Sequence, residues 1–323
     1  MKRKLFSAML SAFALLLLMG AAASPDPAYA LVAEEESVVQ EETALETEAQ
    51  LPSDIPEQTD TDVPTIEEET AVPPAAVNDP YLLINGQPAP LDMNRELQNG
   101  TTYVSLAVMA QQLDPAAQIS WDGSTAAVVT EKLTLTAQVG QLYLVANGRY
   151  LYVPEAVQMN HAGQVAVPLR VAARAFDTAV GYDEATGVVT LTSGSGAILP
   201  GEAYYNENDL FWLSRVIYRE SGNQSLEGQM AVGNVVLNRV ADPIFPDTVE
   251  GVLAQKNQFS TYQSGVLRNT TPSQSSIIAA KLVMDGGVVD ETYGALFFDA
   301  GVNSWASRNK RHIATFGDHH FYG

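Results

Sequence analysis

The feature that most constrains the fold is an internal repeat, because the stretch 81–193 nearly repeats itself at an offset of about 62 residues. The run NGTTYVSL at 99–106 is answered by AGQVAVPL at 162–169, and a short alanine-rich stretch follows each copy. A repeat of this kind uses one supersecondary unit twice. The fold therefore has to accommodate two similar units packed together.

Each copy has the pattern of a β-hairpin, a strand, a short helix and a second hairpin. Asn-Gly pairs at the first hairpin favour a tight two-residue turn, and pairs that begin with Asp stand at the second hairpin. The sequence thus predicts one small α+β domain over 81–195, made of two repeats. Residues that break regular structure then mark the boundary to a last domain: Gly194, Gly196, Pro200 and Gly201.

The first 30 residues have the pattern of a secretory signal peptide. Basic residues at 2–4 precede an apolar run over 5–19, and the small-x-small sequence at 28–30 fits a signal peptidase site. The alternative is an uncleaved membrane anchor, although a spanning helix needs about 20 apolar residues. We expect cleavage, no stable membrane span afterwards, and an exported protein. The chain has no cysteine, so its stability outside the cell must come from packing.

The next segment, 31–80, is expected to be a disordered acidic linker. It contains no Lys or Arg, many acidic residues and several prolines, a composition that cannot bury a core. It would form an extended tether between membrane and wall, or a degradable propeptide. Most of the net charge of -21 lies in this segment, and the remainder of the chain is only mildly acidic. Nucleic acid is therefore a poor partner.

The stretch 203–239 predicts two consecutive helices, with a glutamate at the end of the first. The apolar face of the first helix ends in Glu220, Gly222 lets the chain leave the helix, and Ser225 caps the second. A helix C-terminus and an apolar face both disfavour a charged carboxylate, so we expect a raised pKa for Glu220. A glutamate that stays protonated near neutral pH suits general acid catalysis of glycosidic cleavage.

Several motifs of this last domain stand in one order. They are LxxxIYxESG at 213–222, EGQxAVGxVVLNRV at 227–240, QFS at 258–260 and GDHHFY at 317–322. This set resembles the cell wall hydrolase family of the spore cortex-lytic enzymes, over roughly 205–323. The resemblance implies a mainly α, lysozyme-like domain that cleaves the glycan strand of peptidoglycan as a lytic transglycosylase, with no cofactor and no metal. It also implies a secreted protein associated with the cell wall of the spore or the vegetative envelope, with a role in sporulation, germination or wall remodelling.

By this resemblance, Glu220 becomes the single catalytic acid/base. It would protonate the glycosidic oxygen that leaves N-acetylmuramic acid and then accept a proton from the 6-hydroxyl of that sugar, giving a 1,6-anhydro product. Such chemistry needs no second carboxylate to activate water. Glu227 matches a family position, but an acid in the first turn of a helix favours the helix dipole, and we interpret it as structural. Asn223 departs from the family, which usually has glutamate there.

Further side chains are predicted to bind the sugar. Gln258, Ser260 and Tyr262 offer hydrogen bonds and an aromatic face by position and residue type. Aromatic residues later in the chain would form the opposite wall of a groove, and a histidine its floor. The complete prediction for substrate binding is Ser221, Gln258, Ser260, Tyr262, Tyr293, Trp305 and His319.

The repeated domain resembles the copper amine oxidase N-terminal domain, a stalk module of exported proteins. Nothing in it suggests copper, since His161 is its only histidine and no cluster of His, Cys and Met is present. Such a stalk would bind a wall polymer or a protein partner, self-associate, or serve as a spacer. Its aromatic side chains at Tyr103, Trp121, Tyr150 and Tyr182 could stack on sugars, but at these spacings we expect them in the core.

Alternatives to the transglycosylase remain open. Arg215 and Arg219 lie within helical reach and could pair with Glu220 on a solvated rim. Three of the four histidines lie within 312–320 beside an aspartate, which would suit a zinc-dependent peptidoglycan amidase or peptidase. Two of these histidines are adjacent, however, and would point in opposite directions in a strand. A non-catalytic wall-binding protein is the third alternative.

Overall fold

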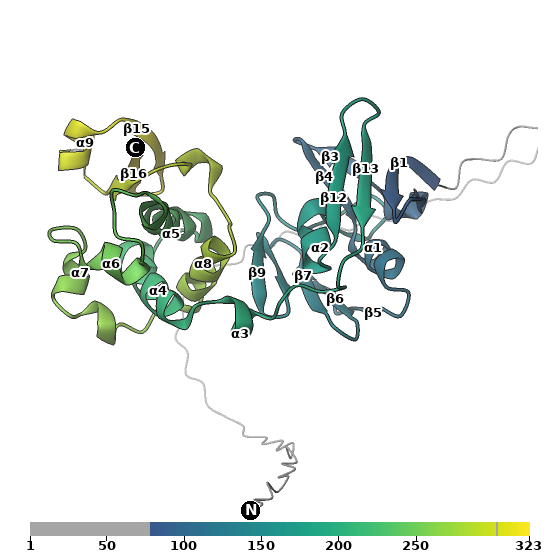
Figure 1. Cartoon of the computed structure of the whole chain (residues 1–323), viewed down its shortest axis with the longest axis horizontal. Coiled ribbons are helices and arrows are strands. Elements are labelled where there is room, and N and C mark those ends of the chain that lie inside the picture. Colours follow the sequence, from purple (N-terminus) through teal and green to yellow (C-terminus); the bar gives the residue numbers. More distant parts are fainter. Residues whose placement is uncertain (1–77, 302) are drawn as a thin grey trace, which may run out of the picture. The chain divides into compact units, whose positions relative to one another are not determined.

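The structure, a computed structural model, describes residues 78–301 and 303–323. The predicted signal peptide lies outside the described residues, as does nearly all of the predicted acidic linker. Within the described part, no helix is both long and apolar enough to cross a membrane. We call β1 to β13 with α1 and α2 the β-rich domain, and α3 to β16 the C-terminal domain (Figure 1).

Three sheets and two short helices form the β-rich domain. The first sheet has the order β12 (Ala179–Asp183), β13 (Val188–Thr192), β1 (Asn78–Ile84), β2 (Gln87–Pro90). The second has the order β10 (Gln158–Met159), β11 (Val165–Pro168), β4 (Thr101–Ser105), β3 (Glu96–Gln98). The third has the order β5 (Gln118–Trp121), β6 (Thr125–Val129), β7 (Thr134–Gln138), β8 (Tyr143–Ala146), β9 (Arg149–Tyr152). The helices are α1 (Leu106–Leu113) and α2 (Leu169–Ala175), and a 3-10 turn spans Leu91–Met93.

The two halves of this domain are interleaved. β1 pairs in parallel with β13 and β4 pairs antiparallel with β11, so both pairings join the first half of the domain to the second. In each half a strand leads directly into a helix, β4 into α1 and β11 into α2. The predicted Asn-Gly turns are present, with Asn85 and Asn147 at positive φ angles of 50° and 48°. The hairpins and helices predicted from the repeat thus share one core.

The predicted aromatic core is only partly right. Tyr103 is fully buried, and burial beside Glu155 raises the pKa of its hydroxyl to about 12. Trp121 and Tyr182 are instead 47% and 57% exposed. The prediction was wrong for these two residues because they lie on β5 and β12, which are edge strands and leave side chains open to solvent. Tyr150 is half-buried and packs against the core of the C-terminal domain.

The C-terminal domain combines helices with a small sheet (Figure 1). Its helices are α3 (Gly201–Tyr204), α4 (Glu207–Ser221), α5 (Leu226–Ala241), α6 (Val249–Ala254), α7 (Ser260–Gln263), α8 (Gln274–Met284) and α9 (Trp305–Asn309). Its 3-10 turns are Leu267–Asn269 and Asp290–Thr292. Its sheet has the order β14 (Phe297–Asp299), β16 (His319–Tyr322), β15 (His312–Phe316).

Local sequence signals account for the ends of the main helices. The side chains of Asn206, Ser225 and Ser273 each accept a hydrogen bond from a backbone N–H in the first turn of α4, α5 and α8. Gly222 ends α4 in a right-handed conformation with φ of -61°, so a left-handed turn is not the reason for glycine. A Cβ atom at Gly222 would lie 2.5 Å from the carbonyl oxygen of Tyr218, and this close approach requires glycine.

Helices α4, α5 and α8 pack together around fully buried apolar side chains. Gly233 of α5 faces both other helices, since a Cβ atom there would lie 2.9 Å from Ile217 and 3.1 Å from Val283. Phe321 of β16 is also fully buried in this core. The central strand β16 was not predicted. The helical domain therefore carries a small sheet along part of its core.

The hairpin formed by β8 and β9 joins the two domains. Three of its tyrosines, Tyr143, Tyr150 and Tyr152, pack against the core of the C-terminal domain. The hydroxyl of Tyr152 donates a hydrogen bond of 2.8 Å to Glu227 in the first turn of α5. Glu227 therefore has a structural role, as predicted, although its hydrogen-bond partner lies in the other domain.

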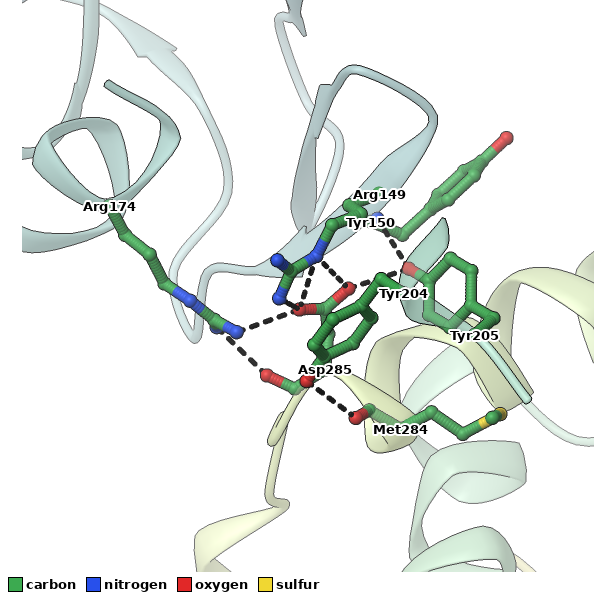
Figure 2. A network of polar contacts seen from close by, with 7 residues as sticks. All are labelled: Arg149, Tyr150, Arg174, Tyr204, Tyr205, Met284 and Asp285. Atoms are coloured by element: carbon green, nitrogen blue, oxygen red, sulfur yellow. Dashed lines mark hydrogen bonds and ion pairs between the residues drawn. The ribbon is translucent and has the colours of Figure 1, made fainter. Parts of the chain in front are cut away.

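A buried carboxylate completes the junction, as Figure 2 shows. Asp285, which follows α8, accepts hydrogen bonds from Arg149 at 2.5 Å, Arg174 at 2.7 Å and the hydroxyl of Tyr205 at 2.6 Å. Arg174 also donates to the backbone carbonyl of Asp285 at 2.8 Å. The Tyr205 hydroxyl in turn accepts from the backbone N–H of Tyr150. Two arginines of the β-rich domain thus converge on one residue of the C-terminal domain.

We predict that Asp285→Asn lowers the free energy of unfolding by about 3 to 5 kcal/mol, because it leaves the buried Arg149 without its counter-charge. The side chains of Arg149 and Asp285 are 7% and 0% exposed, so solvent cannot replace the lost partner. Urea unfolding measures the change, with the exposed Asp290→Asn as the matched control. A loss equal to that of the control would contradict a stabilising role of the junction.

Candidate active site

Glu220 lies in the last turn of α4 and is half-buried. Its neighbours Ile217 and Ser221 face the core, and the Ser221 hydroxyl is fully buried and donates to the carbonyl oxygen of Ile217 at 2.9 Å. The only side-chain hydrogen bond to the Glu220 carboxylate within the described residues comes from the hydroxyl of Thr261 in α7, at 3.4 Å. The carboxylate is therefore held loosely at the surface of the helical core.

Burial raises the pKa of Glu220 above its ordinary value, as the sequence predicted. The hydrogen bond from Thr261 and the positive charge of Arg219 act in the opposite direction and do not cancel this effect. Arg215 bonds the carbonyl oxygen of Phe211 and stacks on its ring, with Cζ 3.5 Å from the ring centroid. In the described chain neither arginine forms an ion pair with Glu220, so the structural ion pair is not found.

His319 of β16 is 7% exposed and lies beside the backbone of Glu220. Its ring packs edge-on against Phe298 of β14, with centroids 5.5 Å apart. Burial lowers the pKa of His319, while the charge of Asp318 and a hydrogen bond with the Glu220 backbone oppose this shift. The structure therefore brings His319 to the backbone of Glu220, and its buried ring favours the neutral form.

The turn after Glu220 is fastened to the turn between β15 and β16. The Gln224 side chain donates to Asp318 at 2.9 Å and accepts from the backbone N–H of Asp318 at 3.2 Å. Gly317 makes this contact possible, because its φ is 58° and a Cβ atom there would lie 2.0 Å from the Gln224 side-chain oxygen. This pair of hydrogen bonds fixes β16, and with it His319, against the end of α4.

The segment before and within α7 forms the third side of the site. Gln258 is exposed and accepts a hydrogen bond of 3.1 Å from Arg239. Ser260 is exposed at the start of α7. Tyr262 donates to Glu250 at 3.0 Å and packs against Trp212, with ring centroids 5.1 Å apart. Of the predicted sugar-binding residues, these three lie on the same segment as Thr261.

The remaining predicted residues are placed differently. Ser221 cannot contact a ligand, because its side chain is buried and bonds its own helix, and the prediction was wrong for it. Tyr293 is 75% exposed after a 3-10 turn. Trp305 is 56% exposed at the start of α9 and lies against Phe297, with centroids 5.6 Å apart. Both aromatic residues are open to solvent, but no contact described in the structure ties either of them to Glu220.

Two residues of the site were missed by the sequence analysis. Thr261 lies between two predicted residues and is the one whose hydroxyl reaches Glu220. Arg239 belongs to the motif at 227–240 and is buried, although arginine is a residue type expected at the surface. Its position two turns along α5 from the buried Ala231 was the available signal, because that face lies inward.

Other carboxylates near the site are engaged elsewhere. Glu227 is bonded by Tyr152 and Asp318 by Gln224. Within the part of the chain that the structure describes, Arg219 is the one charged residue that shifts the pKa of Glu220.

No group of three or more His, Cys, Asp or Glu in residues 78–301 and 303–323 is arranged to hold a metal ion. His319 and His320 belong to opposite faces of β16, as predicted: His319 packs on Phe298, and His320 lies 2.8 Å from Thr315.

Comparison with known families agrees with both resemblances. Residues 83–191 match the copper amine oxidase N-terminal domain, and residues 223–322 match the cell wall hydrolase family. Over these residues the C-terminal domain is therefore similar to the cell wall hydrolase family. The match to this domain begins just after Glu220, so it does not itself include the glutamate.

The chain is also similar to spore cortex-lytic enzymes. Those of Bacillus cereus and Halalkalibacterium halodurans are 33% and 30% identical over 105 and 122 residues, which are 31% and 37% of this chain. The matched regions cover 39% and 36% of these proteins, so the chain spans less than half of their length.

Two solved structures are also similar to this chain. One is the catalytic domain of a germination-specific lytic transglycosylase, SleB, from Bacillus anthracis, with 28% identity and a TM-score of 0.34. The other is the catalytic domain of SleB from Bacillus cereus, with 29% identity and a TM-score of 0.33. They cover 39% and 40% of this chain, and all of their own chains are covered.

We predict that Glu220→Gln stabilises the protein at neutral pH. The raised pKa means that the folded state holds the Glu220 proton more tightly than the unfolded state, in which the pKa of glutamate is about 4.3. The wild type therefore loses stability as the pH rises above that value, whereas the uncharged glutamine does not. Thermal unfolding between pH 4 and 8 should show a difference that grows with pH. The exposed Glu202→Gln is the control, and an equal stability of Glu220→Gln and wild type at pH 8 would contradict a buried carboxylate.

Proposed function

We propose that this protein cleaves the glycan strand of peptidoglycan as a lytic transglycosylase, with Glu220 as its single acid/base. The observation that carries the proposal is a half-buried carboxyl group with a raised pKa, whose one side-chain hydrogen bond in the described residues comes from Thr261. Hydrolysis by paired carboxylates needs a partner about 5 to 9.5 Å away to act as nucleophile or base. A transglycosylase needs none, because the substrate supplies its own nucleophile.

In the proposed reaction, protonated Glu220 donates its proton to the glycosidic oxygen that links N-acetylmuramic acid to the next sugar. The bond from C1 to this oxygen breaks, and the leaving sugar departs with a hydroxyl. The 6-hydroxyl of the muramyl residue then bonds to C1, while the Glu220 carboxylate takes the hydroxyl proton. Glu220 ends in its original form, and the product is a 1,6-anhydro sugar.

The surrounding residues support this cycle. Thr261 bonds the Glu220 carboxylate, and this interaction favours the charged form that must exist midway through the cycle. We propose that Gln258, Ser260 and Tyr262 contact the N-acetyl sugars on one side. Tyr293 and Trp305 would contribute exposed aromatic faces farther along the glycan. His319 would act indirectly, by supporting the backbone of Glu220.

We further propose that the β-rich domain is a duplicated stalk that binds a wall polymer or a protein partner. The matching element order in its two halves supports the duplication. The protein would be secreted and act on peptidoglycan of the spore cortex or the vegetative wall. The relatives that it resembles are named spore cortex-lytic enzymes, which favours a role in germination or sporulation.

The decisive test is a digest of purified peptidoglycan, read by mass spectrometry of the released fragments. We expect anhydro-muramyl products from residues 78–323, with and without EDTA, and at least about a thousandfold less product from Glu220→Gln, because the general acid is lost. Glu227→Gln, which alters an acid bonded to Tyr152, serves as the matched control and should retain activity. Release of peptides that EDTA abolishes would favour a zinc amidase, and glycan binding without any release would favour a non-catalytic protein.

The pH dependence offers a separate prediction. The first step requires protonated Glu220, so activity should fall as the pH rises through its raised pKa. Thr261→Val removes a hydrogen bond that lowers this pKa, so the alkaline limb of the pH–rate profile should move to higher pH. Ser264→Ala, in a residue that bonds the Thr261 carbonyl oxygen, should leave the limb in place. A limb that moves to lower pH in Thr261→Val would oppose the assignment of Glu220 as the acid.

A further inference from the structure

Arg239 is a buried cation that the proposed reaction does not use. It lies on α5 and is 3% exposed. Its Nε atom donates to the carbonyl oxygen of Leu296 at 2.6 Å, and Nη1 donates to the side chain of Gln258 at 3.1 Å. Burial lowers the pKa of Arg239 to about 10, which still leaves it charged near neutral pH.

The surroundings of Arg239 are aromatic. Its Cζ atom lies 5.3, 5.6 and 5.1 Å from the ring centroids of Phe245, Phe259 and Phe297. No carboxylate within the described chain forms an ion pair with it, unlike Arg149 at the domain junction. Cation–π contacts and charge-assisted hydrogen bonds offset part of the desolvation penalty. An apolar side chain would fill this space without that penalty, so stability alone does not account for the arginine.

The two hydrogen bonds of Arg239 reach the two segments that flank Glu220. Gln258 stands just before α7, whose Thr261 donates to the Glu220 carboxylate. Leu296 stands just before β14, whose Phe298 supports the ring of His319.

The rings between these segments close the connection. The ring centroid of Phe259, the residue after Gln258, lies 6.5 Å from that of Phe298. The Cζ atom of Arg239 lies 5.6 Å from the same Phe259 ring. One guanidinium group therefore links the segment that bears Thr261 to the strand that supports His319.

We propose that Arg239 is a positioning residue that sets the spacing of these two segments around Glu220. The inference rests on the proposed function, because it names what the spacing serves. Arginine suits this task, since its planar fork directs two donors at fixed angles toward two different acceptors. A lysine at the same position keeps the charge but can direct only a single nitrogen, so it cannot hold both acceptors in the same geometry.

The first test compares Arg239→Lys with wild type in the peptidoglycan digest. Misplacement of the Glu220 surroundings by a fraction of an ångström should lower kcat by about 10- to 100-fold and change KM by less than about threefold. Arg215→Lys is the matched control, because Arg215 also bonds a backbone carbonyl oxygen and stacks on a phenylalanine, but forms no hydrogen bond with α7 or β14 in the described residues. An equal loss of kcat in both variants would overturn the proposal.

A double-mutant cycle separates positioning from general destabilisation. If Arg239 acts through Thr261, Arg239→Lys should lower kcat much less in a Thr261→Val background than in wild type. Independent, multiplying effects of the two substitutions would contradict the connection through α7.

Hydrogen exchange tests the same idea without any reaction. In Arg239→Lys, backbone amides at 258–262 and 296–298 should exchange at least about tenfold faster, while those of α8 remain unchanged. Unchanged exchange in both segments would overturn the inference even if the protein cleaves peptidoglycan. If the wild type does not cleave peptidoglycan but Arg239→Lys exchanges faster in both segments, Arg239 anchors these segments and the proposed function is rejected.

Discussion

The arrangement of this protein depends on one buried carboxylate, that of Asp285. Its side chain is fully buried and receives donors from Arg149, Arg174 and Tyr205, so charge and hydrogen-bonding capacity are both satisfied. A carboxylate in this position would be highly unfavourable without these partners, which makes the contact specific for one orientation of the two domains. The tyrosines of the β8–β9 hairpin then add apolar contact around it. Polar specificity and apolar burial thus act at the same place.

Glu220 shows the opposite treatment of a carboxylate. Asp285 receives several strong donors, whereas Glu220 receives a single long hydrogen bond from Thr261. Burial favours the protonated form of Glu220, whereas the two arginines and Tyr205 offset the cost of burying the Asp285 carboxylate. The difference lies in the number of donors that the fold directs at each group. A structural carboxylate and a candidate acid can thus be told apart by their partners.

The sequence predicted those features that depend on neighbouring residues. The N-cap at Ser225 and the Asn-Gly turns of the hairpins follow from short-range geometry. It also predicted the direction of the Glu220 pKa, because the apolar face and the helix end are visible in the periodicity.

Contacts between distant residues were beyond the reach of the sequence. The pairing of β1 with β13, the hydrogen bond from Thr261 to Glu220 and the hydrogen bond from the buried Arg239 to Leu296 all join residues far apart along the chain. Ser221 was predicted to bind the sugar, but one helical step from Glu220 turns its side chain to the core.

At the junction the two domains also approach closely. A Cβ atom at Gly201 would lie 2.6 Å from the carbonyl oxygen of Gly148, so the helical domain and the hairpin are shaped to each other. Residues 205–323 without this hairpin would expose the part of their core that Tyr143, Tyr150 and Tyr152 cover.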